Sequence, residues 1–285
     1  FTFKNTTERL EHHEEAPSLK ECLHLLATNR PLLMLFLGNI FFVIIKVSEQ
    51  ASFYFAYDAL FNAKYNGFLD IAKAPGSFLA GIFVPIIIER LGRKADSKKF
   101  YQACCVMGIV LNGLFALCTY NGIMNKGAGQ SVSLLTGLMV IVFSAVVTFP
   151  LEFKNLMQKE MEAETVDYVE WKTGKRVEGT MLSIMSFTGK LEGTLSSFIC
   201  LQVLARTGYV EHTTDVSTLQ NHSTLLGLFL MTTVFPMVGY ALMLIPMHFY
   251  NITGDSHRRM IKDIMARRAQ AGEAAAQEAV AAEAK

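Results

Sequence analysis

One lysine stands near the middle of an otherwise apolar run and calls for a physical explanation. Lys190 lies about ten residues into the apolar segment 180–205, which is roughly 16 Å from its start if the segment is helical. A charge at that depth in hydrocarbon costs at least about 2.5–3.5 kcal/mol. Glu192 cannot offset this cost, because residues two apart lie on opposite helix faces. Lys190 therefore needs a distant carboxylate, an aqueous cavity or the loss of its proton. We expect Lys190 to lie on a substrate or ion pathway; a structural ion pair is the alternative.

A second group of polar side chains interrupts the apolar segment 31–60. Lys46 and Glu49 are three residues apart, so they share a helix face and can partly satisfy each other. Gln50, Tyr54 and Tyr57 continue this polar group along the segment, and we call the five residues the polar wall. We predict that this wall contacts substrate; for the two tyrosines, anchoring at a membrane interface is the alternative.

Six apolar segments must position these charges. They cover approximately residues 31–60, 66–88, 100–120, 132–157, 180–205 and 225–249. Each is long enough to cross a hydrocarbon layer about 30 Å thick as a helix. The sequence therefore predicts an all-α integral membrane protein. Its six-helix transmembrane bundle would occupy residues 31–250, between a polar leader (1–30) and a polar tail (251–285).

The distribution of Lys and Arg predicts the orientation of the bundle. Basic residues gather in the leader, in the second-to-third and fourth-to-fifth connections and in the tail, whereas the three opposite connections hold only Lys64, Lys126 and Arg206. By the positive-inside rule both termini are cytoplasmic. We assign Lys154 to the cytoplasmic cations of the fourth-to-fifth connection.

The tail predicts an amphipathic helix with a disordered end after about residue 272. Its apolar face carries Met260, Ile261, Ile264 and Met265, and basic residues lie mostly opposite. Such a helix suits the anionic inner surface of a membrane. A solvated tail with a short helix is the alternative.

Composition narrows the function classes. The net charge of +1 says nothing about partners. With 51% apolar residues gathered in long runs, we expect the lipid bilayer as partner and no nucleic acid. The five cysteines are scattered, which indicates neither a disulfide framework nor a zinc site. No phosphate-binding glycine loop or nucleophile motif is visible, so we predict no enzyme, no cofactor and no metal site in this chain.

The charged stretch before Lys190 identifies a family. The segment TVDYVEWKTGKRVEGTMLSIMSFTGKLEG (165–193) resembles the glycoside–pentoside–hexuronide:cation symporters, which are melibiose-permease-like members of the major facilitator superfamily. Arg176 and Lys190 fit the family's spacing. The leader's Asn29-Arg30-Pro31, the aromatic stretch SFYFAY (52–57) and ERLGRK (89–94) agree with the same pattern.

The resemblance implies a twelve-helix fold of which this chain is the C-terminal half, with residues 1–30 as the central cytoplasmic loop. The implied function is secondary active symport of a sugar or glycoside with Na⁺ or H⁺ by alternating access, in the plasma (inner) membrane. The partners would be the sugar, the cation and the N-terminal six-helix half, which would hold most of the cation site.

The resemblance also implies roles for particular residues. Lys190 would couple to carboxylates of the N-terminal half. Substrate would contact Ser186, Met185 and Gly189 on the same helix. A cytoplasmic gate would comprise Glu164, Asp167, Arg176 and Glu178.

Two other functions stay open at this point. Met185 is apolar where a polar sugar contact is expected, and such surroundings would tolerate the cargo of a lysolipid or amphiphile transporter of the same superfamily. A non-transporting six-helix membrane scaffold is the alternative from a different class. A polar enclosed cavity would favour sugar, and an apolar lateral opening would favour an amphiphile.

Overall fold

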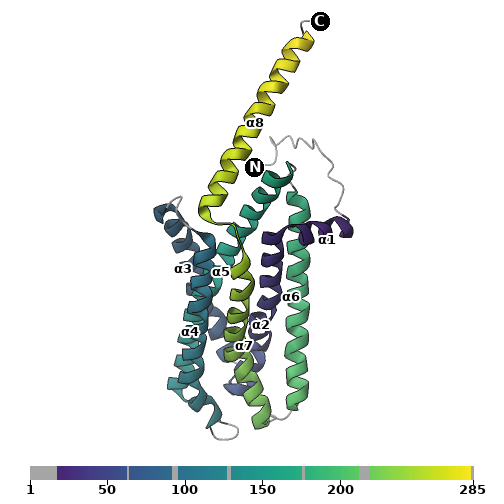
Figure 1. Cartoon of the computed structure of the whole chain (residues 1–285). Helices are drawn as coiled ribbons and strands as arrows, with labels where there is room; N and C mark the ends of the chain where they lie inside the picture. The colour runs from purple at the N-terminus through teal and green to yellow at the C-terminus, as the bar shows by residue number, and fades with distance from the viewer. Residues whose placement is uncertain are drawn as a thin grey trace, which may run out of the picture.

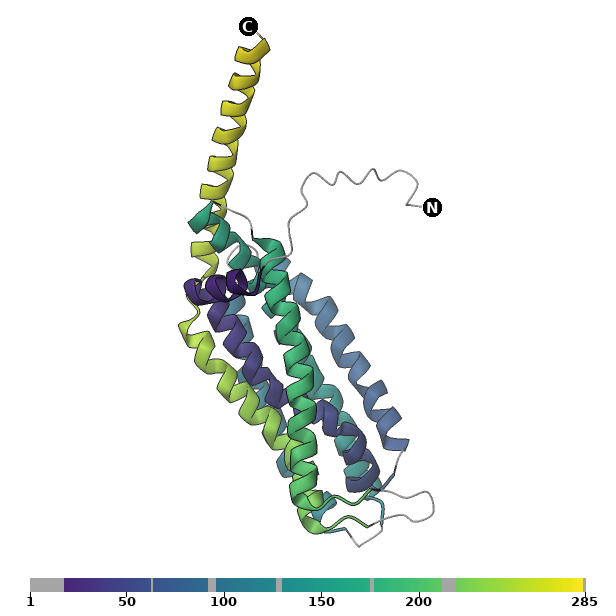
Figure 2. The ribbon, with the colours of Figure 1, turned by 90° about the vertical axis from the view of Figure 1, so that its right-hand side faces the viewer.

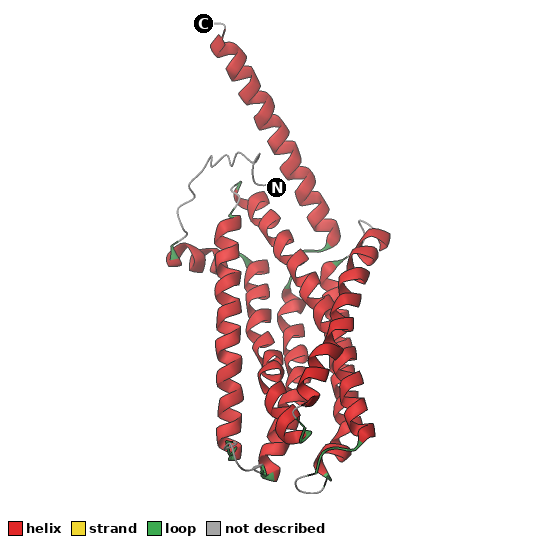
Figure 3. Ribbon diagram, turned by 180° about the vertical axis from the view of Figure 1, so that it is seen from behind, coloured by secondary structure: helices red, strands yellow, loops and turns green. Residues whose placement is uncertain are grey.

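The structure of the chain is a computed structural model. It describes residues 18–62, 64–91, 96–126, 130–174, 177–211 and 219–283. Those residues form helices and connections without a strand (Figure 3). In chain order the helices are α1 (Leu19–Thr28), α2 (Arg30–Tyr54), the π-helical turn η2 (Phe55–Ala59), α3 (Lys64–Leu91), α4 (Ser97–Met124), α5 (Leu134–Thr173), α6 (Glu178–Thr207), α7 (His222–Phe249) and α8 (Gly254–Glu283).

The long helices α2 to α7 run side by side, while α1 lies across one end of the bundle and α8 projects away from that end (Figures 1 and 2). Four of the described helices are long and apolar enough to cross a membrane: α2 with η2, α4, α5 and α7. The all-α membrane class is therefore supported. Helices α3 and α6 have 28 and 30 residues but carry charges within their length, including Asp70 and Lys73 on α3 and Lys190 and Glu192 on α6.

Local sequence signals account for several helix ends. Ser18 and Glu21 form a capping box at the start of α1. The side chain of Asn29 caps α2, whose first turn tolerates Pro31 because the missing amide hydrogen has no helical acceptor there. Helix α5 ends at Gly174, which adopts a left-handed conformation with φ of 74° that favours glycine.

Helix α5 is longer than the predicted span 132–157. It has 40 residues, or about 60 Å at 1.5 Å per residue, so it exceeds the hydrocarbon thickness. Its continuation QKEMEAETVDYVEWKT is rich in strong helix formers and packs against α8. Most of the stretch that the sequence indicated as a cytoplasmic connection is thus helical.

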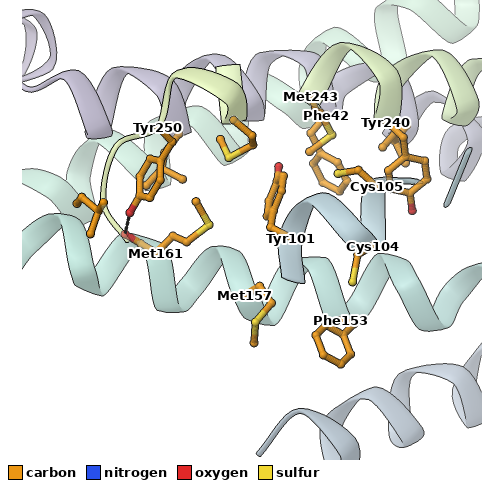
Figure 4. Close-up of a cluster of buried hydrophobic side chains, with 14 of the residues drawn as sticks. Phe42, Tyr101, Cys104, Cys105, Phe153, Met157, Met161, Tyr240, Met243 and Tyr250 are labelled. Atoms are coloured by element: carbon orange, nitrogen blue, oxygen red, sulfur yellow. Dashed lines mark hydrogen bonds between the residues drawn. The ribbon is translucent and has the colours of Figure 1, made fainter. Parts of the chain in front are cut away.

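Close approach of α7 to its neighbours builds the core. A Cβ atom on Gly239 would lie 2.5 Å from Cγ1 of Ile45 on α2, and one on Gly108 of α4 would lie 2.5 Å from the Tyr240 ring. Glycine is required at both contacts because any side chain would overlap its neighbour. Figure 4 shows the buried aromatic and sulfur-containing side chains that fill the adjacent core, with the Tyr250 hydroxyl oxygen 3.3 Å from the carbonyl oxygen of Met161.

The tail differs from its predicted course in two ways. Helix α8 continues to Glu283, beyond the predicted start of disorder near residue 272. Met260 and Ile264 are buried, Met260 within the core cluster that includes α5 residues, whereas Met265 is exposed. Part of the predicted membrane-facing apolar stripe therefore packs against the protein itself.

Candidate functional site

A cavity of about 500 Å³ opens among α2, α3 and α5, with α4 and α7 behind it. Helix α2 packs mainly on α7 and α6, and α5 packs mainly on α4 and α3. Since these two helices have few direct contacts, a gap is left between them. Its charged side chains are Glu49, Asp70, Lys73 and Glu152. Hydroxyl groups come from Ser48, Ser52, Ser77, Ser144, Thr148, Thr232 and Tyr240. The lining therefore mixes polar groups with apolar side chains, including the aromatic rings of Phe53 and Phe115.

Glu49 is the predicted substrate contact that the structure places in this cavity. It is exposed on α2. Gln50 is also exposed, but it is not among the lining residues. Tyr54 is half-buried and packs edge-on against Tyr209, while Tyr57 is 39% exposed and stacks on Phe53. The predicted polar wall of α2 is therefore divided between the cavity and an aromatic group at the far end of the helix.

Lys46 lies beside the cavity rather than in its lining, and its partner is on another helix. Its Nζ atom is 3.2 Å from Oε2 of Glu192 on α6, which is 6% exposed. The expected satisfaction of Lys46 by Glu49 is thus replaced by an ion pair that joins α2 to α6. Position 192 contributes this carboxylate because it lies on the buried face of α6, opposite the face of Lys190.

A fully buried cation lies near this ion pair. Lys154 on α5 is fully buried; its Nζ atom lies 3.7 Å from the centre of the Phe42 ring and donates to Oε1 of Gln158 at 3.3 Å. Gln158 in turn donates to Asn39 on α2 at 2.7 Å. Lys154 therefore belongs to the interior of the helix bundle, and not to the cytoplasmic cations with which the sequence grouped it.

The α6 face predicted to meet substrate and cation points away from the rest of this chain. Lys190 and Ser186 are four residues apart and exposed, and a Cβ atom on Gly189 would meet nothing within 4 Å. Met185 is half-buried and its sulfur lies 3.8 Å from Nδ2 of Asn39. Among the described residues lining the cavity, none comes from α6. The structure thus separates the Lys190 face from the cavity wall.

The predicted gate residues Glu164 and Asp167 lie on the polar continuation of α5, where they bind other segments of the same chain. Glu164 accepts hydrogen bonds from Ser97 at 2.9 Å and from Tyr250 at 3.2 Å. Asp167 pairs with Nε2 of His257 on α8 at 2.9 Å. Glu178 is exposed at the start of α6, and Arg176 lies outside the described residues.

Further contacts extend this attachment of α8 to the end of α5. Trp171 donates to Asp263 at 3.0 Å, Arg267 donates to the Trp171 carbonyl at 2.8 Å, and Arg268 pairs with Glu170. The hydrogen bond to Asp167 raises the pKa of His257 above its ordinary value, while partial burial opposes the shift. We call this set of contacts the α5–α8 latch.

Several site residues lacked a clear sequence signal. Asp70 was not singled out, and Lys73 and Glu152 are isolated charges whose shared cavity depends on how α3 and α5 pack. Glu192 could have been found, because a carboxylate within an apolar helix requires a partner and Lys46 is a cation in the same situation. The identity of that partner required the structure.

Comparison with known proteins agrees with this architecture. A family model described as MFS/sugar transport protein matches residues 1–254, so the chain belongs to this family of the major facilitator superfamily. An uncharacterized symporter, YjmB, of Bacillus subtilis (strain 168) is 25% identical over 92% of this chain and 53% of its own length. A putative 2,3-dihydroxypropane-1-sulfonate exporter of Salmonella typhimurium is 27% identical over 89% of this chain and 50% of its own length.

A third relative is described as an isoprimeverose transporter. This protein of Lactiplantibacillus pentosus is 24% identical over 94% of the chain and 52% of its own length. The chain therefore spans about half the length of these curated relatives. All three are described as transport proteins, which accords with the prediction that the chain is not an enzyme.

Proposed function

We propose that this chain is the C-terminal six-helix half of a cation-coupled sugar symporter that works by alternating access. The cavity among α2, α3 and α5, which combines carboxylates and hydroxyls with aromatic rings, is the observation that carries the proposal. Hydroxyls, carboxylates and aromatic rings in one recess can bind the hydroxyl groups and the apolar ring faces of a sugar. The relative described as an isoprimeverose transporter supports a saccharide as cargo.

In this proposal the exposed α6 face meets the N-terminal half. Lys190, Ser186 and Gly189 point away from their own bundle, as expected for residues whose partners belong to another part of the transporter. Lys190 would hold the carboxylates of a Na⁺ or H⁺ site ionised across the central cavity. Two halves rocking about a site between them would then expose it to each side of the membrane in turn.

The α5–α8 latch gives the proposed inner gate a mechanical anchor. Glu164 binds the extended end of α5 to the start of α4 and to Tyr250 after α7, and Asp167 binds it to α8. Closing the cytoplasmic side would bring this end against the N-terminal half, with Arg176 and Glu178 adjacent in sequence. Both chain termini would then be cytoplasmic, and the plasma membrane would be the location.

An amphiphile transporter is less well supported. Such a cargo needs a largely apolar opening toward lipid, whereas the cavity lining includes four charged side chains and seven hydroxyl groups beside its apolar side chains. A scaffold without transport would have no use for this recess.

Uptake of labelled saccharides by the full-length transporter in proteoliposomes tests the proposal. An inward Na⁺ or H⁺ gradient should drive accumulation of at least one neutral glycoside above its equilibrium level, and a matching ionophore should abolish that excess. Equilibration without accumulation would contradict cation coupling. Absence of any saccharide uptake, in vesicles that contain folded protein, would contradict the proposed function.

A further inference from the structure

Four of the seven hydroxyl groups in the cavity lining donate their protons within the protein. The side chains of Ser48 and Ser77 donate to carbonyls of their own helices at 2.8 and 3.4 Å. Those of Thr148 and Thr232 do the same at 2.7 and 3.0 Å. A hydroxyl has one proton and two lone pairs, so each of these groups is left to act toward a ligand as an acceptor.

The charged side chains give the wall the same character. Glu49, Asp70 and Glu152 are acceptors when ionised, and they outnumber the single cation, Lys73. Three negative charges and one positive charge give the lining a formal net charge of −2. Lys73 is itself bound to Asp70 at 3.1 Å, so part of its donor capacity is already used.

The amide side chains do not reverse this balance. Asn112 donates to the Gly108 carbonyl at 2.8 Å, and Asn66 is the other amide in the lining. The wall therefore offers more acceptors than unused donors, together with excess negative charge. A ligand that fits it must bring its own hydrogen-bond donors.

We propose that this cavity selects saccharides that carry no negative charge, so that neutral polyhydroxy sugars and amino sugars are carried in preference to uronates and sulfonates. The inference rests on the proposed function and names the substrate class of the same site. A neutral sugar presents several O–H donors, and an ammonium group adds charge-assisted ones. A carboxylate or sulfonate would face like charges and would leave its own acceptors and those of the wall unpaired.

The test compares a neutral glucoside with two derivatives, each of which differs from it at a single position of the sugar. Methyl β-glucoside, methyl β-glucuronide and methyl 2-amino-2-deoxy-β-glucoside compete with a transported neutral sugar for the full-length transporter in proteoliposomes. We expect the glucuronide to be at least about tenfold weaker than the glucoside, and the amino sugar to equal or exceed the glucoside. A glucuronide that competes as well as the glucoside would overturn the inference.

Variants assign the selectivity to the cavity. Asp70→Asn and Glu152→Gln should each lower the ratio of glucoside to glucuronide affinity by about threefold or more, because each removes one repelling charge. Glu160→Gln is the matched control on α5, since Glu160 is exposed and outside the cavity. A ratio measured within one preparation does not depend on the amount of folded protein, and Glu49→Gln replaces any variant that fails to insert.

The outcomes separate this inference from the proposed function. If neutral saccharides are transported and the glucuronide is preferred, the transporter function stands and the selectivity is wrong. Equal ratios in the wild type, the cavity variants and Glu160→Gln would remove this cavity from substrate choice. Failure to transport any saccharide would reject the function itself.

Discussion

Removing one partner of the Lys46–Glu192 ion pair should destabilise the protein much more than removing both. At 3.2 Å and an effective dielectric constant of about 20, the attraction between the two charges is about 5 kcal/mol. Desolvation of both groups opposes this attraction, so the net contribution of the pair is small. A single substitution keeps the desolvation cost and loses the attraction.

We therefore expect Lys46→Met or Glu192→Met alone to lower the free energy of unfolding by about 3–5 kcal/mol, and the double variant to return close to the wild type. The assay is thermal unfolding of the purified protein in detergent, where 1 kcal/mol corresponds to roughly 2–4 °C in a protein of this size. The matched control is Lys159→Met, which removes an exposed pair with Glu162 at 2.8 Å and should cost about 0–1 kcal/mol.

Two results would contradict the expected coupling between Lys46 and Glu192. Single variants no less stable than Lys159→Met would mean that the buried pair contributes no coupling between α2 and α6. A double variant as unstable as the sum of both single variants would mean that each side chain acts through packing alone.

Three further predictions concern other contacts. Because its pKa is raised in the folded protein, His257 should stabilise the fold below about pH 6.5 and lose that effect as the pH rises through the pKa of the folded state. The difference in Tm between the wild type and His257→Gln should therefore be larger at pH 5.5 than at pH 8.5. An equal difference at the two pH values would contradict the α5–α8 latch. Phe42→Leu should lower the free energy of unfolding by about 1–3 kcal/mol. In a Lys154→Met background the loss should be about 1–2 kcal/mol smaller, because the cation–π contact is then already absent. If the two substitutions lower the stability additively in thermal unfolding, that contact is excluded. Gly239→Ala should lower the free energy of unfolding by about 1–3 kcal/mol through overlap with α2. At Gly81 a Cβ atom would meet nothing within 4 Å, so Gly81→Ala should be neutral or slightly stabilising. Similar values of Tm for the two variants would contradict the close packing at Gly239.

Features that depend on composition and on the length of apolar runs were predictable from the sequence. Long apolar runs require helices in a membrane, so the all-α class follows from composition and length alone. The family followed from the charged stretch before Lys190, and the match over residues 1–254 confirms it. The six spans and the cytoplasmic placement of the ends stay predictions.

Pairings between distant residues were not predictable, because they depend on how helices rotate against each other. Lys46 and Glu49 are neighbours on one helix face, yet Lys46 binds Glu192 on α6 and Glu49 lines the cavity. Lys154 follows an apolar stretch and precedes a polar one, which suggested a helix end. Continuation of α5 to Thr173 instead placed it inside the bundle, where Phe42 faces its ammonium group.

The measurement that tests the account most directly is cation-driven saccharide accumulation by the full-length transporter with Lys190 intact, changed to Ala, or changed to Arg. We predict that Lys190→Ala, while folded and inserted, loses accumulation above equilibrium, and that Lys190→Arg retains part of it because the charge remains. If Lys190→Ala accumulates saccharide as the wild type does, Lys190 has no part in coupling, and the proposed role of the exposed α6 face is wrong.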